Sequence, residues 1–104
     1  MLEKLEAVYA HFKEIELLLS SPEVASDVKR FTKLNKEYRD LEEIVQTYFE
    51  YKNCVHRIAE ARDILKNEKD KELRDMAKEE LDELEPLQIG LEERIRIQLL
   101  PKDP

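Results

Sequence analysis

The sequence predicts an all-α fold, an elongated antiparallel three-helix bundle that resembles a coiled coil. The 104 residues include only one glycine, so the tight hairpin turns that many sheet folds require are scarce. Apolar residues recur every three or four positions, which is the spacing of one helix face. Charged residues make up 41% of the chain and both signs are interleaved, as on the solvent-exposed faces of a folded helical bundle.

The first predicted helix covers about residues 2–20. Its apolar stripe consists of Leu5, Val8, Tyr9, Phe12, Ile15, Leu18 and Leu19. A short segment then interrupts the pattern. Within it, Ser21 is a candidate cap for a short helical turn that has Pro22 at its first position, and Ser26 is a candidate cap for the next helix. We therefore expect a corner in the chain at these residues.

The second predicted helix covers about residues 27–66, a stretch without glycine or proline. At 1.5 Å per residue it would be roughly 60 Å long. The three-and-four spacing slips near Leu41 and Ile44, so its apolar seam is expected to face first one partner helix and then another. The stripe consists of Phe31, Leu34, Tyr38, Leu41, Ile44, Val45, Tyr48, Tyr51, Val55, Ile58 and Leu65.

The third predicted helix covers about residues 71–100, with Asp70 as its N-cap. Pro86 and Gly90 disfavour a helix, but the apolar spacing continues in phase across both, so we expect one helix with a kink before Pro86. Its stripe consists of Leu73, Met76, Ala77, Leu81, Leu84, Leu87, Leu91, Ile95 and Leu99. Residues 1–100 are thus predicted to form one helical domain, and residues 101–104 to begin a linker.

No group of residues has the spacing of a catalytic, cofactor-binding or metal site. His11 and His56 are 45 positions apart, and neither has a second histidine or a cysteine one helical turn away. Cys54 and His56 are two positions apart, so on a helix they point in nearly opposite directions and cannot act as nucleophile and base. We expect Cys54 to lie on the flank of its helix as an unreactive thiol. The acidic run at 79–85 lacks the glycine turn of a calcium loop and is interpreted as a solvated face.

The charge distribution identifies one candidate docking surface. The chain has a net charge of −7, which argues against binding to DNA. Residues 70–100 contain ten acidic and five basic side chains, whereas residues 27–39 contain five basic and two acidic ones. Within the latter, Lys29, Lys33 and Lys36 share one helix face. One interpretation is a solvated face with exchangeable ion pairs. The other is a docking patch for an acidic partner, RNA included, formed by Lys29, Arg30, Lys33 and Lys36.

A cytoplasmic location is expected. A single cysteine cannot form an internal disulfide, and the N-terminal residues are charged where a secretory signal requires an apolar run. No stretch approaches the roughly 20 consecutive apolar residues that span a bilayer. The sequence therefore predicts neither a secreted nor a membrane protein.

Several strings in the chain resemble the N-terminal domain of bacterial class 1 peptide chain release factors. They are Met-Leu-Glu-Lys-Leu-Glu-Ala-Val at 1–8, Ser-Pro-Glu-Val at 21–24, Lys-Glu-Tyr-Arg-Asp-Leu-Glu-Glu-Ile-Val at 36–45, Lys-Glu-Leu-Arg-Asp-Met-Ala at 71–77 and Leu-Leu-Pro-Lys-Asp-Pro at 99–104. The last string is the most specific, and it resembles the factor that reads UAA and UAG. Together the strings extend over the whole chain.

The resemblance implies a non-catalytic element that positions a translation termination factor near the stalk base of the large ribosomal subunit. The full protein would promote stop-codon-dependent hydrolysis of peptidyl-tRNA. Its implied partners are the ribosome and, through the full-length protein, the recycling GTPase and the release-factor glutamine methyltransferase. The Gly-Gly-Gln loop and the Pro-x-Thr element of the family are absent, so no catalytic or decoding residue is carried over. The alternative is a free-standing coiled-coil module for protein–protein interaction.

Overall fold

The structure, a computed structural model, describes residues 1–101, and these form four α-helices without a strand. The helices are α1 (Leu2–Leu19), α2 (Pro22–Ala25), α3 (Val28–Asn67) and α4 (Lys71–Gln98). The all-α prediction is confirmed, and each predicted long helix agrees with an observed one to within two residues at either end. The linker predicted at 101–104 lies, apart from Pro101, outside the described residues. The chain divides into two compact units, one ending at Tyr48 and the other beginning at Phe49, and α3 runs through both.

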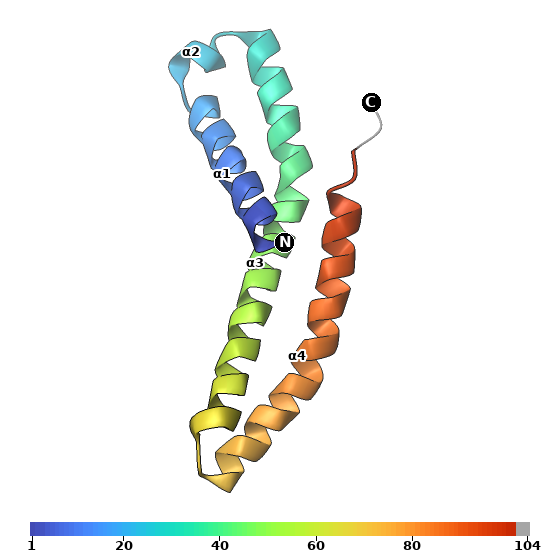
Figure 1. Cartoon of the computed structure of the whole chain (residues 1–104). Coiled ribbons are helices and arrows are strands. Elements are labelled where there is room, and N and C mark those ends of the chain that lie inside the picture. The colour runs from blue at the N-terminus through green and yellow to red at the C-terminus, as the bar shows by residue number, and fades with distance from the viewer. Residues whose placement is uncertain (102–104) are drawn as a thin grey trace. The chain divides into compact units, whose positions relative to one another are not determined.

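In the first unit, α1 packs against the first part of α3, with the two helices running in opposite directions (Figure 1). The rings of Phe12 and Tyr38 stack with their centroids 4.4 Å apart, and those of Tyr9 and Tyr48 with centroids 5.5 Å apart. These rings adjoin or belong to an apolar core that is almost completely removed from solvent. Its members include Leu5, Phe12, Ile15, Val24, Ile44 and Val45.

The corner between α1 and α3 is the short helix α2. Pro22 starts it, as the sequence predicts, but Ser21 makes no side-chain capping bond. The prediction that Ser26 caps α3 is wrong, because Ser26 has helical backbone angles and ends α2 instead, donating its hydroxyl to Glu23 O. Asp27 takes the capping role, since its Oδ1 accepts a hydrogen bond from the backbone N–H of Arg30 at 3.2 Å.

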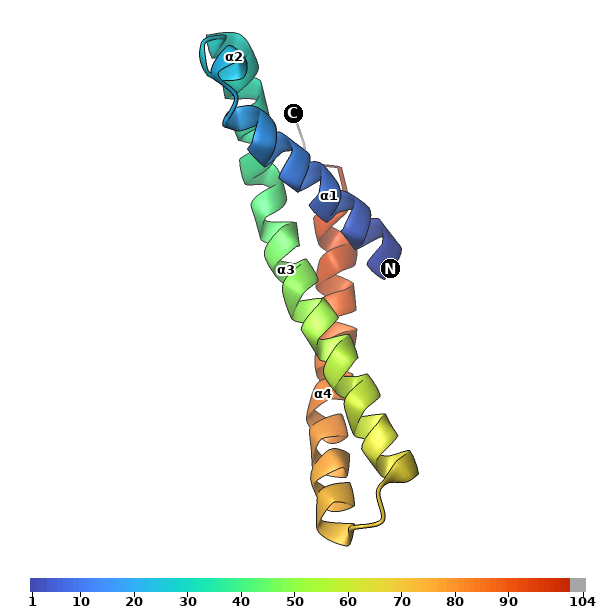
Figure 2. The ribbon, with the colours of Figure 1, turned by 90° about the vertical axis from the view of Figure 1, so that its left-hand side faces the viewer.

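In the second unit, the last part of α3 and all of α4 form an antiparallel hairpin (Figure 2). Asp70 caps α4 as predicted, accepting a hydrogen bond from Glu72 N at 2.9 Å. Arg74, one turn into α4, donates to the carbonyl oxygens of Leu65 and Glu68. These carbonyls lie at the end of α3, where a helix has no backbone donors left to satisfy them. The turn is thus stabilised by a cap on each of its two helices.

Pro86 does not end α4, which confirms the prediction that one helix continues across it; the helix covers Lys71–Gln98, two residues fewer than the predicted 71–100. Figure 1 shows α4 changing direction near its middle. Proline lacks the N–H that would bond to the preceding turn, and its ring pushes that turn away, so a bend is the expected response. Gly90 needs no special conformation, since its φ is negative and a Cβ placed there would meet nothing within 4 Å.

The buried seam in this unit is narrower than the apolar stripe predicted for α4. Leu84 and Leu91 are buried, but Leu87 is 49% exposed, and Leu73, Met76 and Leu99 are also exposed. The prediction that these four residues belong to the core is therefore wrong. A single partner helix covers only a narrow line of positions on α4, so apolar residues beside that line stay in contact with water. The buried positions of α4 are Ala77, Leu81, Leu84, Leu91 and Ile95.

No helix in residues 1–101 combines the length and the apolar composition that crossing a membrane requires.

Two leucines on α4 test this assignment of the seam. Leu84→Ala should lower the free energy of unfolding by about 2–4 kcal/mol because it opens a cavity in a closed core. Leu87→Ala, the same substitution at a half-exposed site, should lower it by less than about 1 kcal/mol. Urea unfolding followed by circular dichroism measures both values. An equal drop in stability for the two variants would contradict the seam described here.

Candidate functional site

The four basic residues singled out from the sequence lie on the first turns of α3. Lys29, Arg30, Lys33 and Lys36 are all exposed. Within residues 1–101 none of their side chains forms an ion pair or a hydrogen bond. We refer to these four residues as the basic patch. No carboxylate within the described residues forms an ion pair with these cations, so they remain available to an anionic partner.

The geometry of α3 directs the basic patch away from α1. Lys29, Lys33 and Lys36 follow one another at spacings of four and three and so share a face, with Arg30 at its side. Tyr38 lies about half a helical turn away from that face and packs on Phe12 of α1. Its hydroxyl also donates to a Glu16 carboxylate oxygen at 3.2 Å. The contact with α1 thus fixes which side of α3 presents the cations.

The position of the basic patch on α3 is electrostatically unfavourable for the helix itself. The N-terminal end of a helix carries a partial positive charge, so acidic residues stabilise it and basic residues do not. The other three helices follow this rule, with Glu3, Glu23 and Glu72 in their first turns, whereas the first turn of α3 has no acidic residue and its only nearby carboxylate there is the N-cap, Asp27. Helix stability therefore does not account for the patch.

In the same unit, a histidine of α1 contacts a carboxylate of α3. His11 Nε2 lies 2.6 Å from Glu37 Oε1, and Glu14 approaches the other ring nitrogen of His11 at 3.8 Å. The hydrogen bond to Glu37 raises the pKa of His11, burial opposes the rise, and the charges of both carboxylates add to it. Sequence spacing gave no sign of this pair, because its members are 26 positions apart and lie on different helices.

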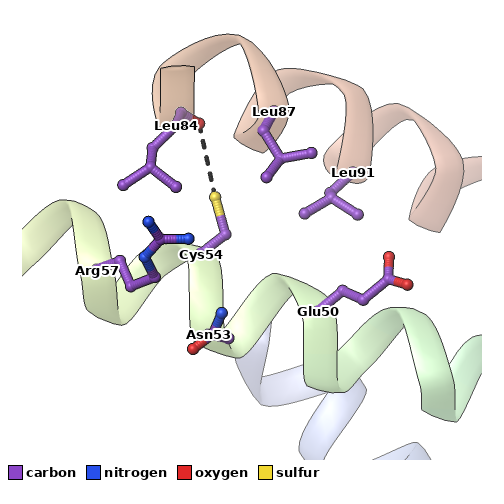
Figure 3. Close-up of a pocket in the computed structure, with 7 residues that line it drawn as sticks. All are labelled: Glu50, Asn53, Cys54, Arg57, Leu84, Leu87 and Leu91. Atoms are coloured by element: carbon purple, nitrogen blue, oxygen red, sulfur yellow. Dashed lines mark hydrogen bonds between the residues drawn. The ribbon is translucent and has the colours of Figure 1, made fainter. Parts of the chain in front are cut away.

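A shallow groove in the second unit lies between α3 and α4 (Figure 3). Leu84, Leu87 and Leu91 line it from α4, and Cys54 lies on the α3 side. Its volume of about 230 Å³ is below the roughly 300–1,000 Å³ of typical small-molecule sites. A hollow of this size suits one or two apolar side chains better than a metabolite.

The prediction that Cys54 lies on the flank of α3 is wrong. Cys54 lies in the buried seam, with 1% of its surface exposed. It takes the core position that the sequence analysis assigned to Val55, which is only half-buried. Its thiol donates to Leu84 O at 3.5 Å, and burial raises its pKa. A thiol with a raised pKa is a poor nucleophile at neutral pH. His56 does not assist it, since its Nε2 pairs with Glu60 at 2.9 Å.

The described residues hold no group of three or more histidine, cysteine or acidic side chains that could bind a metal ion. In the acidic run, Glu80 is half-buried and pairs with Arg57 at 2.8 Å, while Glu79, Asp82, Glu83 and Glu85 are exposed. The arrangement that the structure presents is therefore a set of charged and apolar surfaces on a helical scaffold, which is suited to binding macromolecules.

Comparison with known proteins assigns a family to this scaffold. The family model of the PCRF domain matches residues 8–104. Over all 104 residues the chain is 44% identical to peptide chain release factor 1 of Bacteroides thetaiotaomicron, 47% to that of Agathobacter rectalis and 44% to that of Geobacillus kaustophilus. The matches include the entire chain but only 28% of the first of these proteins and 29% of the other two. No solved structure matches the chain.

The contact between His11 and Glu37 predicts that the stability of the chain depends on pH. Because the pKa of His11 is raised in the folded protein, its contribution to stability is complete below the unfolded value of about 6.5 and disappears as pH rises through the folded value. Glu37→Gln should therefore cost more stability at pH 6 than at pH 8. The difference should be a few tenths of a kcal/mol, since both side chains are about half exposed.

Urea unfolding of the original chain and of the variant at both pH values measures this difference. Glu14→Gln is the matched control, because Glu14 contributes less to the pKa of His11 than Glu37 does. A Glu37→Gln effect that is the same at pH 6 and pH 8 would contradict the prediction.

Proposed function

The chain belongs to the PCRF domain family, and we propose that it is the non-catalytic positioning domain of a bacterial translation termination factor. In this proposal the domain docks near the stalk base of the large ribosomal subunit. It would thereby orient the decoding and catalytic parts of a longer protein, which promotes hydrolysis of peptidyl-tRNA at stop codons. The similarity to proteins named peptide chain release factor 1 supports the proposal, as does the share of about 28–29% that the chain covers of each.

The sequence lacks the catalytic motif of the family, which is consistent with a positioning role. The chain contains one glycine, Gly90, which lies inside α4, so it has no Gly-Gly-Gln loop. Its cysteine is buried and its two histidines pair with glutamates of the helical surface. The recycling GTPase and the release-factor glutamine methyltransferase would act on the longer protein, in the cytoplasm.

The single observation that carries the docking proposal is the basic patch. Ribosomal RNA is a dense array of phosphates, and binding to it is driven largely by lysine and arginine side chains that replace condensed counterions. Lys29, Arg30, Lys33 and Lys36 offer four exposed cations without ion pairs in the described chain, on a face that α1 leaves open. The chain is acidic overall, but the basic patch is a local surface with the positive charge that binding to RNA requires.

Binding of the chain to large ribosomal subunits should depend on salt and on the basic patch. Lys33→Glu combined with Lys36→Glu should weaken binding about tenfold or more. The slope of log affinity against log salt should become shallower by about 0.7–0.9 for each phosphate that the variant no longer neutralises. Fluorescence anisotropy of the labelled chain across a range of salt concentrations measures both quantities.

The matched control is Lys69→Glu combined with Lys78→Glu, which changes the net charge equally at exposed positions of the second unit that have no side-chain ion pair in the described chain. This control should leave the affinity within about twofold of the original. Equal weakening by the two double variants would show that binding depends on the overall charge of the chain and not on the basic patch. Binding that is independent of salt and of the patch variants would refute the proposed surface.

A further inference from the structure

One flank of α4 carries apolar side chains that pairing with α3 leaves uncovered. Leu73, Met76 and Leu87 are 43%, 64% and 49% exposed. With Glu80 and Glu83 they form the series 73, 76, 80, 83 and 87, in which steps of three and four alternate. This is the spacing of a coiled-coil seam, so the five residues form a continuous line beside the buried positions of α4. A line with this spacing is what another helix would cover.

Two hollows follow this line and meet at an ion pair. Met76, Glu79, Glu80 and Glu83 line the first. The second is the groove around Leu87, with Leu84, Leu91 and Cys54 at its base (Figure 3). Glu80 belongs to the first hollow and Arg57 to the second, and their side chains are 2.8 Å apart. The two hollows are therefore neighbours along one face of the hairpin.

The charge of this face selects the kind of partner. Glu79 and Glu83 are exposed and form no ion pair within residues 1–101, while Glu80 has Arg57 as its partner. Residues 70–100 contain twice as many acidic as basic side chains. A second copy of the chain that presented the same face would place acidic groups against acidic groups, and anionic lipid or RNA would be repelled for the same reason. A cationic partner with apolar side chains is the complementary one.

We propose that this face of α4 binds an amphipathic helix of a partner protein that carries lysine or arginine between apolar residues. Apolar side chains of the helix enter the hollow beside Leu87 and cover Met76, and its cations lie against Glu79 and Glu83. This is the helix-in-groove mode of recognition, in which apolar anchors supply affinity and charges fix the register. The surface is in a different unit from the basic patch, so it does not depend on the ribosome-docking proposal.

A synthetic helical peptide tests the proposal directly on the whole chain. The peptide has about three heptads, with leucine at the a and d positions of the outer heptads and arginine at those of the central one. Fluorescence anisotropy should show saturable binding at micromolar concentration. Leu87→Ser and Glu83→Lys should each weaken it about tenfold or more, because one removes an anchor and the other reverses a charge.

Two matched variants lie on the opposite side of the same helix. Ile89→Ser replaces an aliphatic side chain that is 67% exposed, and Glu85→Lys reverses an exposed carboxylate. Each is two positions from its counterpart, about 200° around the helix, so both should leave the affinity within about twofold of the original. A peptide with glutamate in place of arginine should bind the original chain poorly, and Glu79→Lys combined with Glu83→Lys should restore its binding.

Three results would overturn the proposal. The first is no saturable binding of the arginine peptide. The second is equal weakening by Glu85→Lys and Glu83→Lys, which would reduce the interaction to general charge attraction. The third is a dimer in sedimentation equilibrium that Leu87→Ser dissociates, which would make a second copy of the chain the occupant of the groove.

Discussion

The long helix α3 is the element on which the rest of the structure depends. A helix of forty residues in water needs partners for its apolar side chains, because its own hydrogen bonds leave it only marginally stable. In the first unit Tyr38 and Tyr48 of α3 stack on rings of α1, and in the second unit Cys54 of α3 is buried and bonds to Leu84 of α4. The shorter helices α1 and α4 gain their stability from the same contacts. Each unit is therefore a pair of helices, and α3 is common to both.

Because each unit is a pair of helices, parts of the surfaces of α3 and α4 remain uncovered and are available for binding. In the first unit the contact between Phe12 and Tyr38 holds α1 on one side of α3, and the basic patch lies on the other. In the second unit α4 uses a narrow seam, so Met76 and Leu87 remain exposed beside acidic residues. The scaffold therefore presents a cationic surface and an apolar, acidic surface on separate units. The net charge of −7 conceals this separation because it averages over the two.

Local features of the sequence were sufficient to predict the helices, and long-range contacts were not predictable. Asp70 as a cap and the passage of α4 through Pro86 follow from capping chemistry and from spacing within a few turns. The exposure of the basic patch follows in the same way, because Lys29, Lys33 and Lys36 are spaced to share one helix face. Which apolar residues a partner helix covers depends on pairing across the fold, so the burial of Cys54 and the exposure of Leu87 were missed. The cross-helix contact of His11 was missed for the same reason.

The central claim is that α3 is one continuous helix shared by two units, and amide hydrogen exchange along α3 tests it most directly. The measurement, made residue by residue by NMR on the whole chain, should show protected amides on both sides of the boundary at residues 48 and 49 and across it. The buried side chains of Val45, Tyr48 and Tyr51 predict this protection, because opening the helix there would expose them to water. Rapid exchange confined to residues 46–51, with protection on either side, would show two separate helices and contradict the account.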